Sequence, residues 1–488
     1  MQRKGTDEKR SSLGLYYAIV AVCILLMFAG KYIPPFAPEI TPVGMGVLGV
    51  FVGVVLLWST VGDSIWPSIL AVVALGCSGY TSVNAAISAS LGSFMVFSII
   101  CGSAITASLT TTGADQKIAH WLISRKTWEG RPRLFSFAFL FTFFLVSSLT
   151  FAFAMIFVCW TVLRKIAQEM GVTMRHPYFV VMSIYSVVAT SLGEFVIPLK
   201  GWQLALCTLF MDISGITLNY TLYIITTFLI GVLLLVILTL LMRPLFHIDM
   251  MIIRDFHPEE LEGKETRLTG NQIITVVVLV ASIVLSIAAN YLHGSDPISV
   301  VFSTLSMPGI FGLAVVILCI IKGRDGKPLL DFPRVMNGMI WGPLLLVGIA
   351  ICLSSALTAE ECGFMAFFSR VLLPFMDGKP VAFIYAFIIL TAVVLTNVAS
   401  NTGIGMMMVP ISVPICMATG CNMNVAAIVC IYSACYGFIF PSSAAVSPLM
   451  YSNPDLTKKE ILVHTSLPVL LYIVIGCIVF PVLDVVLP

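Results

Sequence analysis

Long uninterrupted runs of apolar residues are the feature that most constrains how this chain can fold. A helix needs about 20 apolar residues to cross the hydrocarbon core of a bilayer. Only helices and closed barrels satisfy their backbone groups there, and these runs do not alternate polar and apolar residues as barrel strands do. The chain is therefore predicted to be an all-α polytopic membrane protein, with apolar runs near residues 13–33, 43–62, 65–80, 89–113, 134–163, 178–210, 217–243, 271–293, 298–322, 336–357, 381–418, 424–451 and 465–487.

Two of these runs are too long for one crossing and carry polar residues at their centres. Ser148 and Thr150 interrupt the run at 134–163, and Ser400–Thr402 interrupt the run at 381–418. Such runs predict re-entrant hairpins, which enter and leave the membrane on the same side. With the two hairpins set aside, about eleven transmembrane helices remain.

The distribution of positive charge predicts the orientation of the chain. Of the 26 Lys and Arg residues, only Lys31, Arg370 and Lys379 lie in predicted outside segments, and Lys200 lies within a membrane run. Because cytoplasmic loops carry the excess of Lys and Arg, we expect the N-terminus inside and the C-terminus outside. The first hairpin then opens inward and the second opens outward.

The composition excludes several classes of function. Only 10% of the residues are charged, against about 25% in soluble domains. No basic stripe indicates nucleic-acid binding, and no CxxC pair occurs among the 13 cysteines. We find no acidic or histidine cluster of the kind that membrane enzymes use, so a transporter is favoured over an enzyme or a scaffold.

The two halves of the chain resemble each other. Ser148-Leu149-Thr150 is echoed by Ser400-Asn401-Thr402, and Ile184-Tyr185-Ser186 recurs as Ile431-Tyr432-Ser433. Similar order and spacing, with hairpins opening on opposite sides, predict two inverted repeats with a site near mid-membrane. The predicted division is a cytoplasmic segment 1–12, a first repeat 13–243 with its hairpin near 134–163 and broken helix 178–210, a cytoplasmic linker 244–270, and a second repeat 271–488 with its hairpin at 381–418 and broken helix at 424–451.

The polar centre of the second hairpin is a candidate binding site. Ser400, Asn401 and Thr402 are residue types that cap the N-terminus of a helix. A helix N-terminus at mid-membrane presents N–H groups and a positive dipole end to an anion. The carbonyl groups left by the same turn can hold a dehydrated cation. The alternative is a cap or an interhelical hydrogen bond with no further role.

Glu194 and Lys200 lie within a run that otherwise reads as membrane. Ionisable residues at membrane depth are costly and are usually functional. A helix broken around Gly193, Pro198 and Gly201 would bring the two side chains together, with Lys200 as a fixed cation or an anion ligand. Alternatively, the break reaches the interface and both side chains extend to water.

The segment Thr396–Thr402, followed by Met408-Val409-Pro410-Ile411, resembles the divalent anion/sodium symporter family. That family carries Ser-Asn-Thr at each of two hairpin tips, each followed by a broken helix. Gly113-Ala114-Asp115 resembles its Gly-Leu-Asp element, and Phe440 to Ser447 lie where its second broken helix has Pro-Pro-Asn.

The resemblance implies a homodimer with a scaffold domain and an elevator-like transport domain in a cell membrane, taken to be a bacterial inner membrane. It also implies sodium-driven uptake of dicarboxylates, citrate or sulfate. Its sodium site corresponds here to Thr396, Ala399, Asn401 and Ser443. The substrate-binding residues would be Ser148, Thr150, Lys200, Asn401, Thr402 and Ser442.

The first half departs from the family pattern. Leu149 stands where an Asn is expected and cannot bind a cation or a carboxylate, and Gly201-Trp202 replace part of a Thr-Pro-Pro-Asn element. We therefore expect the first sodium site to be lost. Our hypothesis is that the Lys200 ammonium replaces that sodium, which would reduce the sodium stoichiometry or let protons couple through Glu194. Sodium-coupled uptake of di- or tricarboxylates is the predicted function, and the alternatives are a monocarboxylate or sulfate transporter and an exchanger.

Overall fold

The fold is seen in a computed structural model of the chain. It describes residues 2–60, 65–123, 126–199, 201–254, 256, 268–289, 297–323, 326–337, 341–376, 378–398, 401–441, 443–444 and 446–487. Across these ranges the regular structure is helical, apart from one isolated bridge between Lys322 and Pro328. The prediction of an all-α fold is confirmed.

The first half contains eleven α-helices within the described ranges. They are α1 (Gln2–Ala29), α2 (Pro42–Thr60), α3 (Ile65–Cys77), α4 (Val83–Ser90), α5 (Phe94–Thr112), α6 (Ala114–Ile123), α7 (Pro132–Leu149), α8 (Ala152–Glu169), α9 (Pro177–Glu194), α10 (Gly201–Ser214) and α11 (Tyr220–Phe246).

The second half contributes the remaining described helices. They are α12 (Gly270–Ala289), α13 (Pro297–Ile320), α14 (Phe332–Asn337), α15 (Trp341–Thr358), α16 (Phe364–Met376), α17 (Val381–Val398), α18 (Asn401–Ala418), α19 (Met423–Ser433), α20 (Ser447–Ser452) and α21 (Lys458–Val486).

Several helices are suited to a bilayer. Within the described residues, α7, α11, α12, α17, α18 and α21 are long and apolar enough to cross it, and the two parts of the kinked α13 would make a seventh crossing. Shorter apolar helices accompany them. The chain is therefore a multi-pass membrane protein. The count of eleven crossings, the inverted repeats and the orientation of the termini stay predictions.

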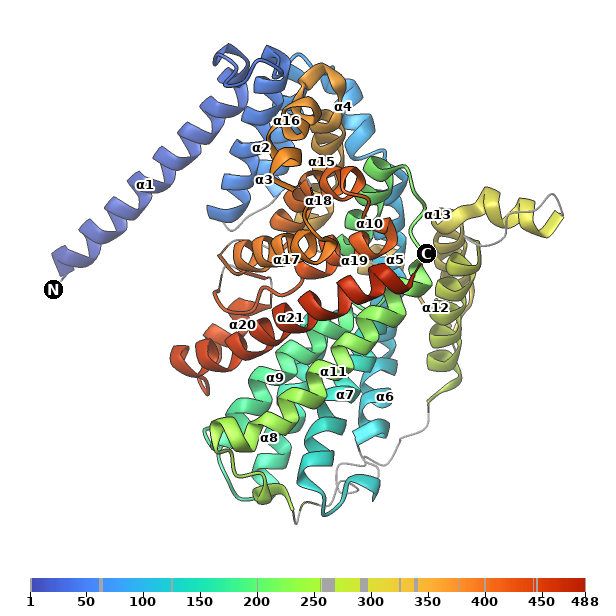
Figure 1. Cartoon of the computed structure of the whole chain (residues 1–488). Helices are drawn as coiled ribbons and strands as arrows, with labels where there is room; N and C mark the ends of the chain where they lie inside the picture. The colour runs from blue at the N-terminus through green and yellow to red at the C-terminus, as the bar shows by residue number, and fades with distance from the viewer. Residues whose placement is uncertain are drawn as a thin grey trace.

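The chain leaves its helical path near each predicted hairpin tip and each predicted helix break, and the re-entrant course of the two hairpins stays a prediction. Helices α7 and α8 are joined by Thr150 and Phe151 alone, and α17 ends at Val398, shortly before α18 begins at Asn401. The first broken helix is interrupted between α9 and α10, and the second between α19 and α20. Figure 1 shows α7, α8 and α9 together in one half of the molecule, while α17, α18 and α19 lie together nearer its centre.

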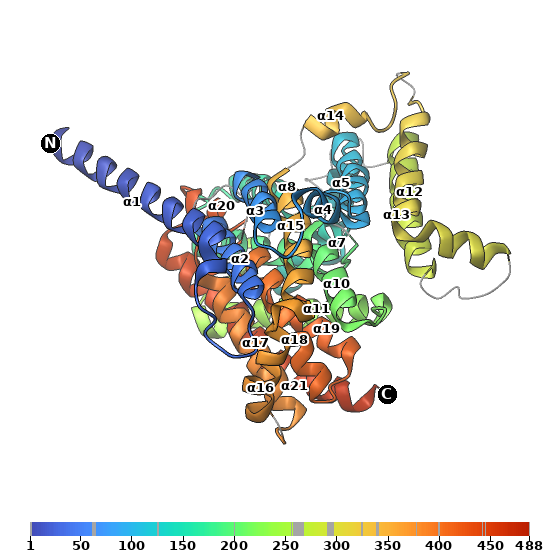
Figure 2. The same cartoon turned by 90° about the horizontal axis from the view of Figure 1, so that it is seen from above.

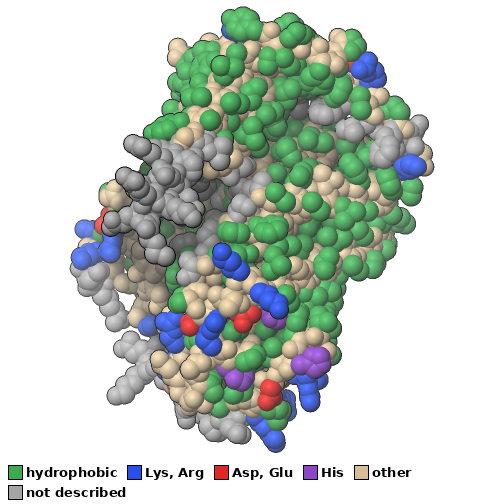
Figure 3. All heavy atoms as spheres, turned by 90° about the vertical axis from the view of Figure 1, so that its left-hand side faces the viewer, with side chains coloured by type: hydrophobic (Ala, Val, Ile, Leu, Met, Phe, Trp, Pro, Cys, Tyr) green, Lys and Arg blue, Asp and Glu red, His purple; other side chains and the backbone are tan. Residues whose placement is uncertain are grey.

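Helices α12 and α13 stand at one edge of the molecule, where they pack on each other and on α5 (Figures 1 and 2). Figure 3 shows hydrophobic side chains over most of one face, with most of its charged and histidine side chains gathered toward the lower end. Such a distribution fits an apolar belt in lipid with one charged end in water.

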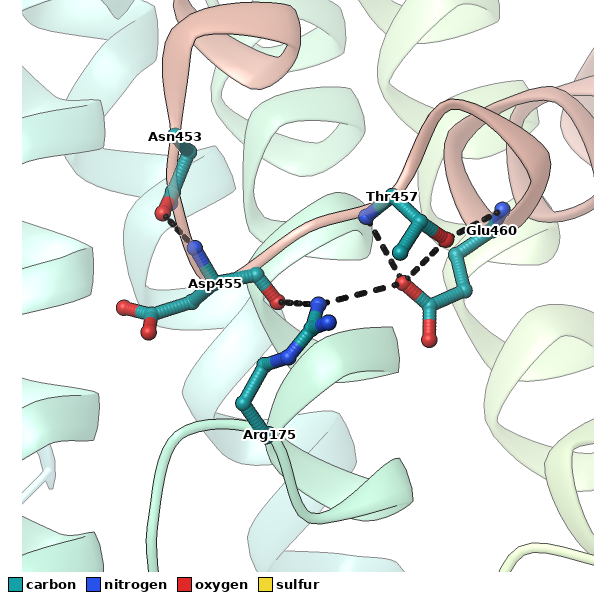
Figure 4. A network of polar contacts seen from close by, with 5 residues as sticks. All are labelled: Arg175, Asn453, Asp455, Thr457 and Glu460. Atoms are coloured by element: carbon teal, nitrogen blue, oxygen red, sulfur yellow. Dashed lines mark hydrogen bonds and ion pairs between the residues drawn. The ribbon is translucent and has the colours of Figure 1, made fainter.

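A polar network at this protein's surface joins the two halves of the chain. Arg175, between α8 and α9, donates a hydrogen bond of 3.1 Å to the carbonyl oxygen of Asp455 and lies 3.8 Å from the Glu460 carboxylate (Figure 4). Glu460 also completes a capping box with Thr457 at the start of α21. The network therefore fixes the loop before α21 against the base of the first hairpin.

We expect Arg175→Ala to lower stability only slightly. The Arg175 and Glu460 side chains are 51% and 36% exposed, and exposed ion pairs contribute at most about 1 kcal/mol. The measurement is the unfolding temperature in detergent, with Lys165→Ala, which removes an exposed pair within α8, as the matched control. A loss several times that of the control would contradict this expectation.

Candidate ion and substrate site

The second helix break places several oxygen atoms against the second hairpin. A Cβ atom built on Gly437 would lie 2.8 Å from the Ser443 carbonyl oxygen, 2.9 Å from the Thr396 carbonyl oxygen and 3.1 Å from Thr396 Oγ1. Thr396 lies in the last turn of α17, and Gly437 and Ser443 lie in the break between α19 and α20. Carbonyl groups at such places have no partner within a helix. Thr396 and Ser443 are fully buried. Gly437 therefore leaves room for three oxygen atoms to surround one small space.

Hydrogen bonds hold this cluster, which we call the Gly437 oxygen cluster (Thr396 O, Thr396 Oγ1 and Ser443 O). Thr396 Oγ1 donates to the Ala434 carbonyl at 2.9 Å. Ser443 Oγ lies 3.0 Å from Ser447 Oγ, and the Asn401 N–H donates to the Ser443 carbonyl at 2.7 Å. The start of α18 is thus tied directly to the broken helix, as the sequence-based assignment of Thr396, Asn401 and Ser443 to one site requires.

Asn397 is a site residue whose role the sequence did not indicate. Its Nδ2 donates to the carbonyl groups of Val393 and Tyr436, both at 2.8 Å. Its Oδ1 accepts from the N–H groups of Phe438 and Ile439, at 3.0 and 2.9 Å. One buried amide therefore satisfies four backbone groups and fixes the path of the break. A polar residue in the hairpin was the only signal in the sequence.

The first turn of α18 is shaped by Asn401. Its Oδ1 accepts from the Thr402 N–H at 2.8 Å and from the Thr402 hydroxyl at 3.3 Å. Gly403, the next residue, is buried, yet a Cβ built on it would meet no described atom within 4 Å. Among the described residues, none therefore packs against this side of the first turn of α18. The predicted site residues Ala399 and Ser442 lie outside the described residues.

The first hairpin tip is built differently. Ser148 Oγ and Thr150 Oγ1 donate to carbonyl groups of their own helix, those of Leu145 and Val146, at 2.7 and 3.1 Å. The Glu194 carboxylate reaches from the end of α9 and accepts a hydrogen bond of 2.9 Å from the N–H of Ala152, the first residue of α8. A carboxyl group of the protein itself therefore already lies at the N-terminus of α8.

Close backbone packing brings Glu194 to this position. A Cβ built on the preceding residue, Gly193, would lie 2.0 Å from the Phe144 carbonyl oxygen of α7. Only glycine allows the two backbones to approach so closely. Lys200, predicted to lie beside Glu194, is outside the described residues, so the structure does not test that pairing.

Leu149 divides the space beside the first tip. A cavity of about 10 Å³ lies on one side, lined by Ser148, by Ile197 and Leu199 of the first break, and by residues of α5, α12 and α13. A second cavity of about 90 Å³ lies on the other side, and Leu149 also lines it. An apolar side chain therefore stands where the family pattern has an amide.

The two tips differ in the chemistry that they offer. Oxygen atoms alone make up the Gly437 oxygen cluster, and a hard cation such as sodium prefers oxygen ligands. The N-terminus of α18 lies next to this cluster, because the Asn401 N–H donates to the Ser443 carbonyl, and a helix N-terminus favours an anion. The N–H of the first residue of α8 is already bonded to the Glu194 carboxyl group. This arrangement suits one cation and one anion held side by side in the second half.

Comparisons with known proteins agree with this architecture. The structure of the YdaH transporter of Alcanivorax borkumensis is similar to this one over 80% of this chain and 84% of the YdaH chain, with a TM-score of 0.53 and 15% identity. MtrF of Neisseria gonorrhoeae is also similar, over 96% of this chain and 94% of the MtrF chain, with a TM-score of 0.53 and 12% identity. Its structure was described with a class of antimetabolite efflux pumps. At such identities these similarities concern the fold. No curated protein matches the chain.

A family model for the transmembrane region of sodium:sulfate symporters matches residues 10–486. The match spans nearly the whole chain, and it confirms the resemblance drawn from the second Ser-Asn-Thr motif. The chain therefore belongs to the sodium:sulfate symporter family, whose members are membrane transporters and not enzymes.

Proposed function

We propose that this protein is a secondary active transporter that couples the uptake of a small anion to sodium bound at the Gly437 oxygen cluster. The observation that carries the proposal is the convergence of Thr396 and Ser443 oxygens on Gly437, next to the first turn of α18. Bound there, sodium would supply positive charge beside the anion. We propose that Thr396, Asn401 and Ser443 form the sodium site. The family resemblance adds Ala399 to this site.

The position of Glu194 favours a compact cargo. A substrate with two separated carboxylates would use the N-termini of both α8 and α18. Because Glu194 already accepts the Ala152 N–H, a second substrate carboxylate there would face a like charge. Sulfate or a monocarboxylate is therefore favoured over the di- or tricarboxylates that the sequence suggested.

We retain the hypothesis that the Lys200 ammonium takes the place of the first sodium. Leu149 at the first tip offers no oxygen ligand, which supports the loss of that ion site. The stoichiometry would then be one sodium for each anion. A flux measurement that gives two or more sodium ions per anion would contradict it. We also propose the elevator movement and the homodimer that the resemblance implies.

The first experiment is a thermal-shift measurement on the purified protein. Sulfate, a monocarboxylate, succinate and citrate would each be added in sodium chloride or in choline chloride. A ligand that binds only the folded state raises stability by RT ln(1 + [L]/Kd), about 2.7 kcal/mol at 100 times Kd. We expect sulfate to stabilise the protein in sodium and far less in choline, and Asn401→Ala to lose the sodium-dependent part.

The outcomes separate the two coupling hypotheses. Stabilisation that is independent of sodium and lost in Lys200→Ala would replace sodium coupling by exchange around a built-in cation. No stabilisation by any of these anions would refute the proposed cargo class.

A further inference from the structure

A buried carboxyl group lies beside the first hairpin tip and takes no part in the site described above. Asp115 is the second residue of α6, which begins directly after Gly113 ends α5 with a left-handed φ of 71°. Its side chain is 1% exposed. Oδ1 accepts the Gln116 N–H at 2.7 Å, whereas Oδ2 accepts no hydrogen bond in the described part of the chain.

The Asp115 carboxyl lines the cavity of about 90 Å³ that borders the hairpin tip. Asp115 and Thr150 are the polar residues of its lining, and the others are Leu, Ile and Val side chains of α5, α6, α7 and α12. One water needs about 10–15 Å³ of such space, so the cavity has room for several. A carboxyl oxygen with no hydrogen-bond partner among the described residues therefore borders this cavity, next to Leu149 and Thr150 of the hairpin tip.

No cation in the described residues lines this cavity to balance an ionised Asp115. Helices α5 and α12 contain no charged residue, and the only one in α7 is Arg133, near the helix end far from the tip. Helix α6 itself carries Lys117, which is not among the lining residues, and His120, whose side chain lies outside the described part.

The chemistry of the lining selects the ligand. An unpaired charge in apolar surroundings is strongly unfavourable, so a buried carboxyl becomes neutral by binding a proton. Burial accordingly raises the pKa of Asp115. A metal cation would need several oxygen ligands, and the lining offers side-chain oxygens from two residues. A proton is therefore the ion that this cavity accommodates.

We propose that Asp115 is a proton-binding site whose occupancy controls the first hairpin tip. With the proton bound, the neutral carboxyl tolerates the apolar cavity, which Leu149 and Thr150 line together with Asp115 and Ile118 of α6. Loss of the proton leaves a carboxylate that must be hydrated, which draws water into the cavity against Leu149 and Thr150 and thereby loosens the packing of the tip. The proton site stands by itself, whereas its coupling to transport rests on the proposed function.

The first test concerns stability and needs no substrate. The folded protein holds the proton to a higher pH than the unfolded chain, so the stability that the bound proton contributes is lost as pH rises. We expect the unfolding temperature of Asp115→Asn to rise relative to wild type between pH 5 and pH 8.5. Asp249→Asn, at an exposed acid of the linker, should run parallel to wild type.

A difference between Asp115→Asn and wild type that does not change with pH would overturn the proton site. If Asp115→Asn fails to fold, infrared spectroscopy replaces the stability test, because a protonated carboxyl group has its own carbonyl band. That band must be present in wild type at neutral pH and must shift in Asp115→Glu. Its absence from wild type would equally overturn the proposal.

The second test concerns coupling. Protein in liposomes that contain a pH-sensitive dye would take up sulfate under a sodium gradient. We expect wild type to move protons with sulfate, and Asp115→Asn to take up sulfate with no proton movement and no dependence on pH. Sodium-driven uptake with unchanged proton movement in Asp115→Asn would refute the coupling. No sodium-driven uptake by wild type would instead refute the proposed function, and the stability test would still decide the proton site.

Discussion

Gly437→Ala is expected to abolish the sodium-dependent stabilisation of this protein by its anion. The new methyl group would lie within 2.9 Å of the carbonyl oxygens of both Thr396 and Ser443, closer than a Cβ approaches such atoms. Because these are backbone atoms, they cannot turn aside as a flexible side chain does. The methyl would fill the space that the proposed sodium needs, and we expect the sodium affinity to fall by more than about tenfold, or ~1.4 kcal/mol.

The measurement is the sodium dependence of the thermal shift with sulfate. Gly270→Ala is the matched control, because a Cβ there meets no described atom within 4 Å. Thr396→Val removes one oxygen of the cluster and keeps the shape of the side chain, so it reports on ligand loss without the steric clash. If both Gly437→Ala and Thr396→Val keep the sodium response of wild type, sodium does not bind at this cluster.

Much of the fold could be predicted because membrane segments follow a simple physical rule. Continuous apolar runs indicated helices, and polar residues at Ser148–Thr150 marked the place where α7 gives way to α8. Gly193, Pro198 and Gly201 indicated the interruption between α9 and α10. These features are local, because a break or a turn in an apolar helix is determined by the residues at that position.

The contacts of the site could not be predicted in the same way. Glu194 meets the N-terminus of α8 only because Gly193 packs against the backbone of α7, 49 positions earlier at Phe144. Asn397 bonds to the Tyr436, Phe438 and Ile439 backbones across a similar distance. In the sequence, Asp115 stands out only as the end of the Gly113-Ala114-Asp115 element. Its burial beside the first hairpin depends on how α6 folds back along α7.

Glu194→Gln is expected to widen the choice of substrate. Glutamine keeps an oxygen that can accept the Ala152 N–H, so the hairpin tip should retain its hydrogen bond, but the negative charge at the N-terminus of α8 is removed. A second substrate carboxylate could then bind where the dipole of α8 favours it. We expect succinate to compete with labelled sulfate at least about tenfold more strongly in Glu194→Gln than in wild type, a change of ~1.4 kcal/mol.

Two control variants separate charge from structure. Glu169→Gln removes an exposed carboxylate from the C-terminus of α8, the end far from the hairpin tip, and should leave the competition unchanged. Glu194→Asp keeps the charge with a shorter side chain, so a change in this variant would report on position. If Glu194 were only a cap, Glu194→Gln would alter stability alone, and succinate would compete as in wild type. A gain for succinate confined to Glu194→Gln would mean that this carboxylate occupies the place of a second substrate charge and thereby restricts the transporter to compact anions.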